Sequence, residues 1–176
     1  MYAGHFAVAL AIKVAEPRAP IAALLGLAFL PDLLWLGFSM GGLELVEPGV
    51  WFDGWSHSIA SIILQAAIVA ILWWRRGVGV SAACACAVLS HLILDLPVHL
   101  APLEWYPHAN SGVGNFLGGW ARNAALFGKT NGWWVEAAIV ICGVSIYLAG
   151  SRRAGVDKAT AGAAAILVAS LHVAFG

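Results

Sequence analysis

The sequence predicts an all-α membrane protein, a polytopic helical bundle of about six transmembrane helices in a single domain covering residues 1–176. Hydrophobic residues make up 61% of the chain and charged residues only 10%, whereas a soluble domain has about 25% charged residues. The mean hydropathy is +0.86. The apolar residues also gather in runs that approach the roughly 20 residues a helix needs to cross a bilayer. These observations make the lipid bilayer the first expected partner.

Six apolar segments can be drawn along the chain. The expected spans are residues 2–15, 19–38, 56–74, 79–100, 132–149 and 158–175. The first is short for a bilayer, so whether it crosses fully is open. The only long connections are residues 39–55 and 101–131, and long loops usually have a functional role.

Lysine and arginine predict the orientation. Only Arg122 and Lys129 lie outside the first, third and fifth connections, which hold the other seven of nine basic residues: Lys13, Arg18, Arg75, Arg76, Arg152, Arg153 and Lys158. Cytoplasmic loops carry the excess of basic residues. We therefore expect a multi-pass protein of the inner (plasma) membrane with both termini on the outer (periplasmic) side. The net charge is zero and there is no basic run, so no nucleic-acid partner is expected.

The ionisable residues predict one polar site near the outer surface. On this topology all six histidines fall toward the outer side, together with four acidic residues: Asp32, Asp53, Asp95 and Glu136. The orientation was set by lysine and arginine alone, so this clustering is independent of it. Ionisable residues inside spanning segments are costly and are usually functional.

The strongest local pattern is the pair His91 and Asp95 in the fourth segment. Helical i,i+4 spacing puts both on one face, and imidazole nitrogen and carboxylate oxygen both bind zinc at about 2 Å. His99 can join them, although Pro97 should bend or end the helix first. The alternative is a neutral, buried hydrogen-bonded pair. We expect a divalent metal ion, with zinc as the first candidate.

Three further residues are predicted metal ligands, and two of them have a structural alternative. Asp32 could instead cap a helix broken at Pro31, His57 could bond at the interface, and His5 opens the first segment. The remaining candidates have other expected roles. His99 and His108 are candidate catalytic proton carriers or further ligands. Asp53 or Ser56 should cap the third segment, Glu136 should cap the fifth, and His172 should pack.

Four motifs in order resemble a known family. GHF near the start, LPD at 30–32, SHS at 56–58 and SHLILDLPVH at 90–99 are similar to those of the membrane-bound metal-dependent hydrolases, also described as LexA-binding, inner-membrane-associated hydrolases. The resemblance covers roughly residues 1–108. It implies a multi-helical membrane protein whose metal site consists of His5, Asp32, His57, His91 and Asp95. Many members read PD-x-D-H where this chain has PDLLW, and H-R-G where it has Phe52, Asp53 and Gly54.

Two functions follow as expectations. The first is a metal-dependent hydrolase acting on an ester or phosphoester of a lipid-like substrate at the outer membrane surface. The second is a non-catalytic subunit of a membrane protein complex on the same scaffold. The departures from the family pattern favour the second function, as do the small residues of the sixth segment, which suit close helix packing: Ala161, Gly162, Ala165 and Ala169. Haem ligation is less well supported, because the neighbouring carboxylates indicate a hard metal ion.

Overall fold

The structure is a computed structural model that describes residues 2–47, 50–99, 101–117, 124–126 and 129–175. The described chain is mostly helical, which confirms the all-α prediction. The long helices are α1 (Tyr2–Ala15), α2 (Ile21–Ala28), α3 (Leu30–Met40), α5 (Ile59–Trp73), α6 (Val78–Asp95), α7 (Asn131–Gly150) and α8 (Lys158–Phe175). A single turn, α4 (Gly54–His57), precedes α5, and a short 3₁₀ helix, η1 (Trp74–Arg76), follows it.

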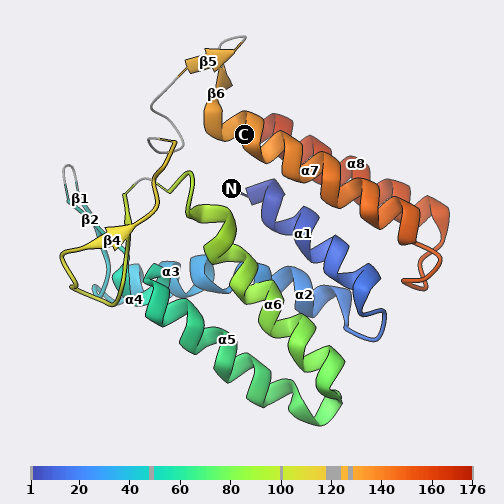
Figure 1. The fold of residues 1–176 in the computed structure, drawn as a ribbon, viewed down its shortest axis with the longest axis horizontal. Helices are drawn as coiled ribbons and strands as arrows, with labels where there is room; N and C mark the ends of the chain where they lie inside the picture. The colour runs from blue at the N-terminus through green and yellow to red at the C-terminus, as the bar shows by residue number, and fades with distance from the viewer. Residues whose placement is uncertain (1, 48–49, 100, 118–123, 127–128, 176) are drawn as a thin grey trace.

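The two long connections contain short antiparallel hairpins. In the first, β1 (Leu45–Glu47) pairs with β2 (Val50–Phe52). The second contains two such hairpins, formed by β3 (Leu103–Glu104) with β4 (Gly112–Val113) and by β5 (Ala124–Leu126) with β6 (Lys129–Thr130). All of them lie on the side of the bundle where α3 ends and α6 ends (Figure 1).

The described helices support four or five membrane spans, so the predicted count of six is not confirmed. Four are long and apolar enough to cross a membrane, namely Ile59–Arg76, Val78–Asp95, Asn131–Gly150 and Lys158–Phe175. The pair formed by α2 and α3 makes a fifth if it counts as one broken span. Helix α1 has 14 residues, and at about 1.5 Å per residue it is shorter than the ~30 Å hydrocarbon core.

The second predicted span, residues 19–38, is two helices bent by 54°. The break follows from Pro31, which lacks a backbone N–H and clashes with the preceding turn in a continuous helix. Proline fits the first turn of a helix, and Pro31 lies there in α3. The break places Asp32 in the first turn of α3 instead of the middle of a long helix.

The fourth predicted span, residues 79–100, also ends early. Helix α6 ends at Asp95, because Pro97 has no backbone N–H to continue the helical hydrogen bonds. The backbone then turns, with the N–H groups of Val98 and His99 both donating to the Asp95 carbonyl. His99 therefore belongs to the connection after α6.

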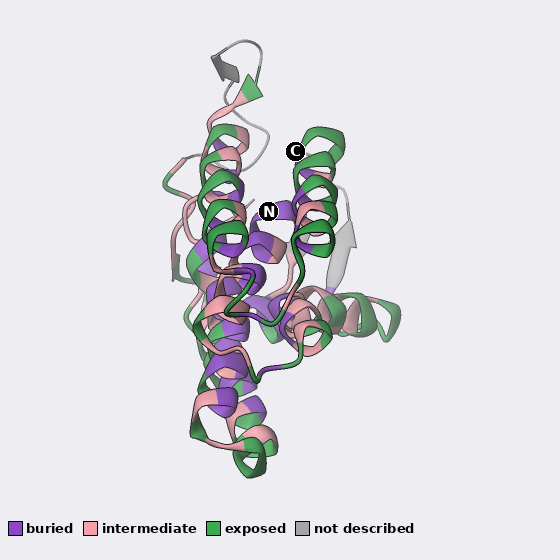
Figure 2. Cartoon of the chain, turned by 90° about the vertical axis from the view of Figure 1, so that its right-hand side faces the viewer, coloured by how far each residue is buried: buried purple, intermediate pink, exposed green. Residues whose placement is uncertain are grey.

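Helix α1 lies at the centre of the bundle and packs on α2, α6, α7 and α8 (Figure 1). One apolar core joins α1 to α2, α5 and α6, and a second joins α1 to α7 and α8. The approach of α7 to α1 requires Gly143, where an added Cβ would lie 2.6 Å from the Ala7 carbonyl oxygen. Exposed residues cover the outward faces of the helices (Figure 2), and many are large and apolar, such as Ile71 and Ile166.

The basic residues and the histidines lie at opposite ends of this bundle. The tight connections α1–α2, α5–α6 and α7–α8 are at the lower right of Figure 1, whereas both termini lie toward the other end. Seven of the nine lysines and arginines lie in those three connections or at the helix ends beside them, including Lys13 in the last turn of α1 and Lys158 at the start of α8.

We expect cysteine labelling to report this polarity in intact cells. In a cysteine-free background, a cysteine replacing exposed Arg75 should be protected from an impermeant maleimide, and one replacing exposed Ser111 should react. The physical reason is the excess of basic residues around Arg75. The reverse labelling pattern would place the histidine-rich end in the cytoplasm.

Candidate metal centre

Helix α6 supplies the centre of a buried polar cluster. His91 and Asp95 lie on one face of α6 and are 0% and 7% exposed. The Nε2 atom of His91 is 3.3 Å from Oδ2 of Asp95. Two ionisable side chains with so little exposure are expensive in an apolar bundle unless a partner compensates them.

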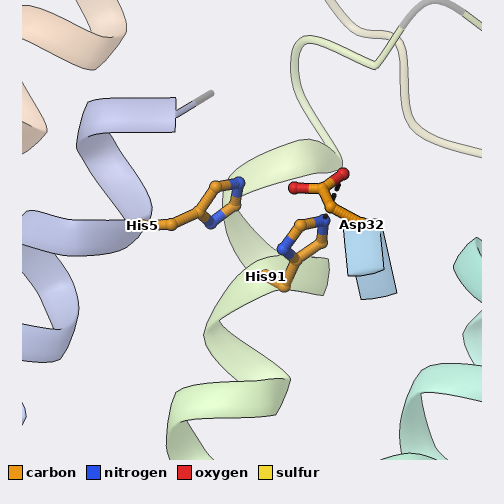
Figure 3. Close-up of side chains that lie close together, drawn as sticks. All are labelled: His5, Asp32 and His91. Carbon is orange, nitrogen blue, oxygen red and sulfur yellow. Dashed lines mark ion pairs between the residues drawn. The ribbon is translucent and has the colours of Figure 1, made fainter. Parts of the chain in front are cut away.

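Three other elements each bring one donor to this pair. From α1, Nε2 of His5 lies 3.4 Å from Oδ1 of Asp95. From α3, Oδ1 of Asp32 lies 3.9 Å from Nε2 of His91 and 3.4 Å from Nε2 of His57, which α4 supplies. Figure 3 shows the rings of His5 and His91 and the carboxylate of Asp32 around one space. All five predicted ligands are thus brought together.

The geometry fits a divalent metal ion. Zinc bonds of about 2.0–2.1 Å in a tetrahedral site put neighbouring donor atoms about 3.3 Å apart, close to the distances given above. Two overlapping groups have donor atoms within 4.8 Å of one another, His5 with Asp32 and His91, and His57 with His91 and Asp95. Among the described residues, Nε2 of His91 and both ring nitrogens of His5 are buried without a hydrogen-bond partner. Such atoms are costly, and a bound cation would compensate them.

The histidines are held with Nε2 free for a ligand. Nδ1 of His91 lies 2.9 Å from the carbonyl of Ala28, the last residue of α2, and the break after it leaves that carbonyl at a helix end. Nδ1 of His57 lies 2.7 Å from Oγ of Ser56. When Nδ1–H donates to these acceptors, Nε2 keeps its lone pair for a metal.

Glu44 is a supporting residue that sequence reasoning missed. It is 1% exposed, and burial raises its pKa. Its carboxylate accepts from the Ser56 backbone N–H at 2.7 Å and from the Ser56 hydroxyl at 2.9 Å. Ser56 thereby links Glu44 to His57, as an oriented second shell does. Only the length of the loop 39–55 pointed to this region.

The residue that caps the third segment in the structure is neither of the two predicted ones. Ser58 caps α5 by accepting from the Ser61 N–H, while Ser56 bonds to Glu44 and His57. Asp53 precedes α4 but makes no side-chain cap bond. Its Oδ2 lies 3.2 Å from Nε2 of His99 instead.

His99 lies at the edge of the cluster. Its ring centroid is 5.7 Å from that of His57, and its Nδ1 is 2.9 Å from the Ala101 carbonyl. Burial opposes protonation of His99, but its hydrogen bond to Asp53 and the nearby negative charges of Asp53 and Asp95 outweigh burial and raise its pKa above 6.5. His99 therefore holds a proton more readily than a free histidine.

Replacing Asp53 by asparagine is expected to lower the pKa of His99, because the pair loses its negative charge. A histidine whose pKa is raised by folding stabilises the protein fully below its unfolded value of about 6.5, and this stability is lost as the pH rises through the folded pKa. The substitution should thus reduce stability at pH 5.5 more than at pH 9. Histidine NMR titration checks the pKa, and an unchanged value would contradict the pairing.

His108 is not drawn into the cluster. Its ring stacks on Phe52 with centroids 4.3 Å apart and meets Trp55 edge-on. The residue is exposed, with a positive φ of 63°. A proton-carrying role for His108 stays a prediction.

A second buried pair ties α7 and α8 to α1. The prediction that Glu136 caps the fifth segment is wrong, because Thr130 caps α7 by accepting from the Trp133 N–H. Glu136 instead accepts from the Gly4 N–H at 3.0 Å and lies 3.1 Å from Nδ1 of His172. Glu136 and His172 are 1% and 5% exposed. The pair fixes the turn of α1 that carries the next residue, His5.

Replacing Glu136 by alanine should destabilise the protein by about 1–3 kcal/mol, because buried donors lose their acceptor. The Gly4 N–H and His172 are the donors affected. Thermal unfolding in detergent measures the loss, and Glu136→Gln, which keeps an acceptor oxygen, should recover part of it. Equal stability of wild type and Glu136→Ala would refute this role.

Comparison with protein-family models, with curated proteins and with solved structures finds no match for this chain.

Proposed function

We propose that this protein is a membrane-bound metal-dependent hydrolase that cleaves an ester or phosphoester of a lipid-like substrate at the outer (periplasmic) side of the inner membrane. One observation carries the proposal. Five donor side chains from four separate elements meet in an apolar bundle, and the central atom, Nε2 of His91, is buried without a hydrogen-bond partner. Zinc is the ion we expect, because the donors are imidazoles and carboxylates.

The residues around the donors suit hydrolysis. A bound divalent ion would supply Lewis acidity and a more acidic water. Asp32 is the most accessible of the five donors, with 34% of its side chain exposed, so the cluster is open on that side. His99, held by Asp53, can store a proton at Nε2 beside the cluster and return it to a leaving group.

The lipid-like substrate is proposed from the setting of the cluster. The donors lie at the end of the bundle opposite the basic connections (Figure 1), where the positive-inside rule places the outer headgroup layer. Exposed aromatic side chains, Trp105 and Tyr106, lie in the neighbouring connection and suit an interface. The ordered motifs that resemble the membrane-bound hydrolases support the same function.

The alternative is a non-catalytic subunit of a membrane complex. The sequence PDLLW favours it, because Leu34 and Trp35 stand where many members of the resembled family have an acid and a histidine. The small residues of α8 support it only in part, since Ala161 and Ala165 are buried within the chain's own bundle, whereas Ala169 is exposed. The five convergent donors lead us to prefer the hydrolase.

The test is turnover by purified protein in detergent with p-nitrophenyl butyrate and bis(p-nitrophenyl) phosphate. We expect at least one probe to be hydrolysed, a chelator to stop the reaction and Zn²⁺ to restore it. His91→Ala should be inactive, whereas Cys86→Ala, at an exposed position on the same helix, should keep activity. Metal-loaded protein without chelator-sensitive turnover on either probe would reject the hydrolase and favour the subunit.

A further inference from the structure

An apolar groove of about 310 Å³ runs between α1, α6 and α7. Helix α1 packs on both α6 and α7. The lining comes mostly from α1 and α7, and α6 contributes Leu94. The lining is hydrocarbon and thiol, including Val8, Leu94, Ile139, Cys142 and Ile146. The volume is near the lower end of the roughly 300–1,000 Å³ typical of ligand pockets, which suits one chain better than a whole lipid.

One end of the groove lies beside the metal centre. Val8 is three residues, about 4.5 Å of helix rise, from the ligand His5 on α1. Leu94 directly precedes the ligand Asp95 on α6. Two of the helices that line the groove, α1 and α6, therefore carry three of the five donors.

The groove faces the bilayer on its open side. The lining residues Ala138 and Cys142 are exposed on α7, a helix long and apolar enough to span a membrane. Its depth depends on the close approach at Gly143, which lines the groove where α7 meets Ala7 of α1. A hydrocarbon chain is the only abundant bilayer component that matches such a lining.

We propose that this groove seats one hydrocarbon chain of the lipid substrate and thereby positions the scissile ester or phosphoester at the His91–Asp95 centre. The inference rests on the proposed function and names the part of the substrate that the fold recognises. A lipid chain is as apolar in the bilayer as in the groove, so it gains no hydrophobic transfer energy, and van der Waals packing against the lining would retain it. The gain is orientation of the reacting bond relative to the metal centre.

The test is photolabelling in dioleoylphosphatidylcholine vesicles that contain a trace of phosphatidylcholine with a diazirine on one acyl chain. We expect adducts on Leu94, Ile139 and Ile146 to exceed those on Ile71 and Ile166 several-fold, although the last two are 74% and 69% exposed. Adduct yields that follow the exposed fraction of each residue would contradict the proposal that the groove holds a lipid chain.

Variants that do or do not fill the groove test whether the excess adducts arise from a chain bound inside it. Cys142→Trp fills the groove and should remove the excess adducts, with unchanged metal content. Ala138→Leu, a smaller change at the exposed wall, should reduce them in part. Cys86→Trp adds the same bulk to α6 at an exposed cysteine outside the groove lining and should change nothing. Equal adducts in wild type and Cys142→Trp would contradict the assignment.

The groove and the proposed function can fail separately. Excess groove adducts without turnover would reject the hydrolase and leave a lipid-chain site. Turnover with adducts that follow exposure would reject the groove and leave the hydrolase. If both hold, Cys142→Trp should slow cleavage of p-nitrophenyl palmitate several-fold more than that of p-nitrophenyl acetate.

Discussion

Replacing His91 by alanine is expected to abolish metal binding. His91 is the donor common to both candidate ligand groups, and it lies within 4 Å of both Asp32 and Asp95. Its loss divides the four remaining donors, because His91 is the residue that both ligand groups share. The affinity should fall by more than the roughly 10- to 100-fold typical of second-shell changes. Elemental analysis of purified protein measures the metal content.

Two further variants separate ligation from packing. Asp95→Asn should weaken metal binding less than His91→Ala, because an amide oxygen is a poorer ligand but keeps the shape of the carboxylate. Ser90→Ala should keep full occupancy, since the Ser90 hydroxyl donates to the Ala87 carbonyl of its own helix. Retention of a full equivalent by His91→Ala would show that this residue is not a ligand.

Replacing Glu44 by alanine should weaken metal binding about 10- to 100-fold without removing a ligand. The variant leaves the Ser56 N–H and hydroxyl without their buried acceptor, which costs about 1–3 kcal/mol of folding stability. His57 then loses the support that orients its ring. Metal titration and chemical unfolding measure the two effects.

Two control variants test whether the effect of Glu44 depends on its hydrogen-bond acceptor and on its position in the fold. Glu44→Gln keeps an acceptor for Ser56 and should recover most of the metal affinity. Glu16→Gln removes a carboxylate that pairs with Arg18 in the α1–α2 connection and should leave metal binding unchanged. If Glu44→Ala binds metal as the wild type does, the link through Ser56 is not functional.

The helical period made two of the five proposed ligands predictable as a pair. His91 and Asp95 are four residues apart, so their shared face follows from any regular helix. That His5, Asp32 and His57 meet them depends on tertiary packing, which residue spacing alone does not determine. The order of the motifs pointed to these residues, whereas their distances required the structure.

The breaks in the helices were harder to place. Pro31 and Pro97 were visible, but the sequence did not show whether each would bend a span or end it. The bend between α2 and α3 turns Asp32 toward His57, and the stop at Asp95 releases His99 to pair with Asp53. Two departures from regular helices therefore shape the site.

Buried acids were the least predictable part. Glu44 lies in a loop without a motif, and Glu136 lies near a helix start where capping is the usual role. Both are buried because they bond to distant backbone groups, Ser56 N–H and Gly4 N–H. Contacts over 12 and 132 residues leave no local pattern in a sequence.

The most direct test of the metal centre is the metal stoichiometry of the purified protein. Inductively coupled plasma mass spectrometry of wild type, after removal of loosely bound ions, should find at least one divalent ion per chain, with zinc expected first. His91→Ala prepared in parallel should hold none. Wild-type protein that contains no stoichiometric divalent ion, and takes up none when titrated with Zn²⁺, would contradict the assignment of His5, Asp32, His57, His91 and Asp95 as metal ligands.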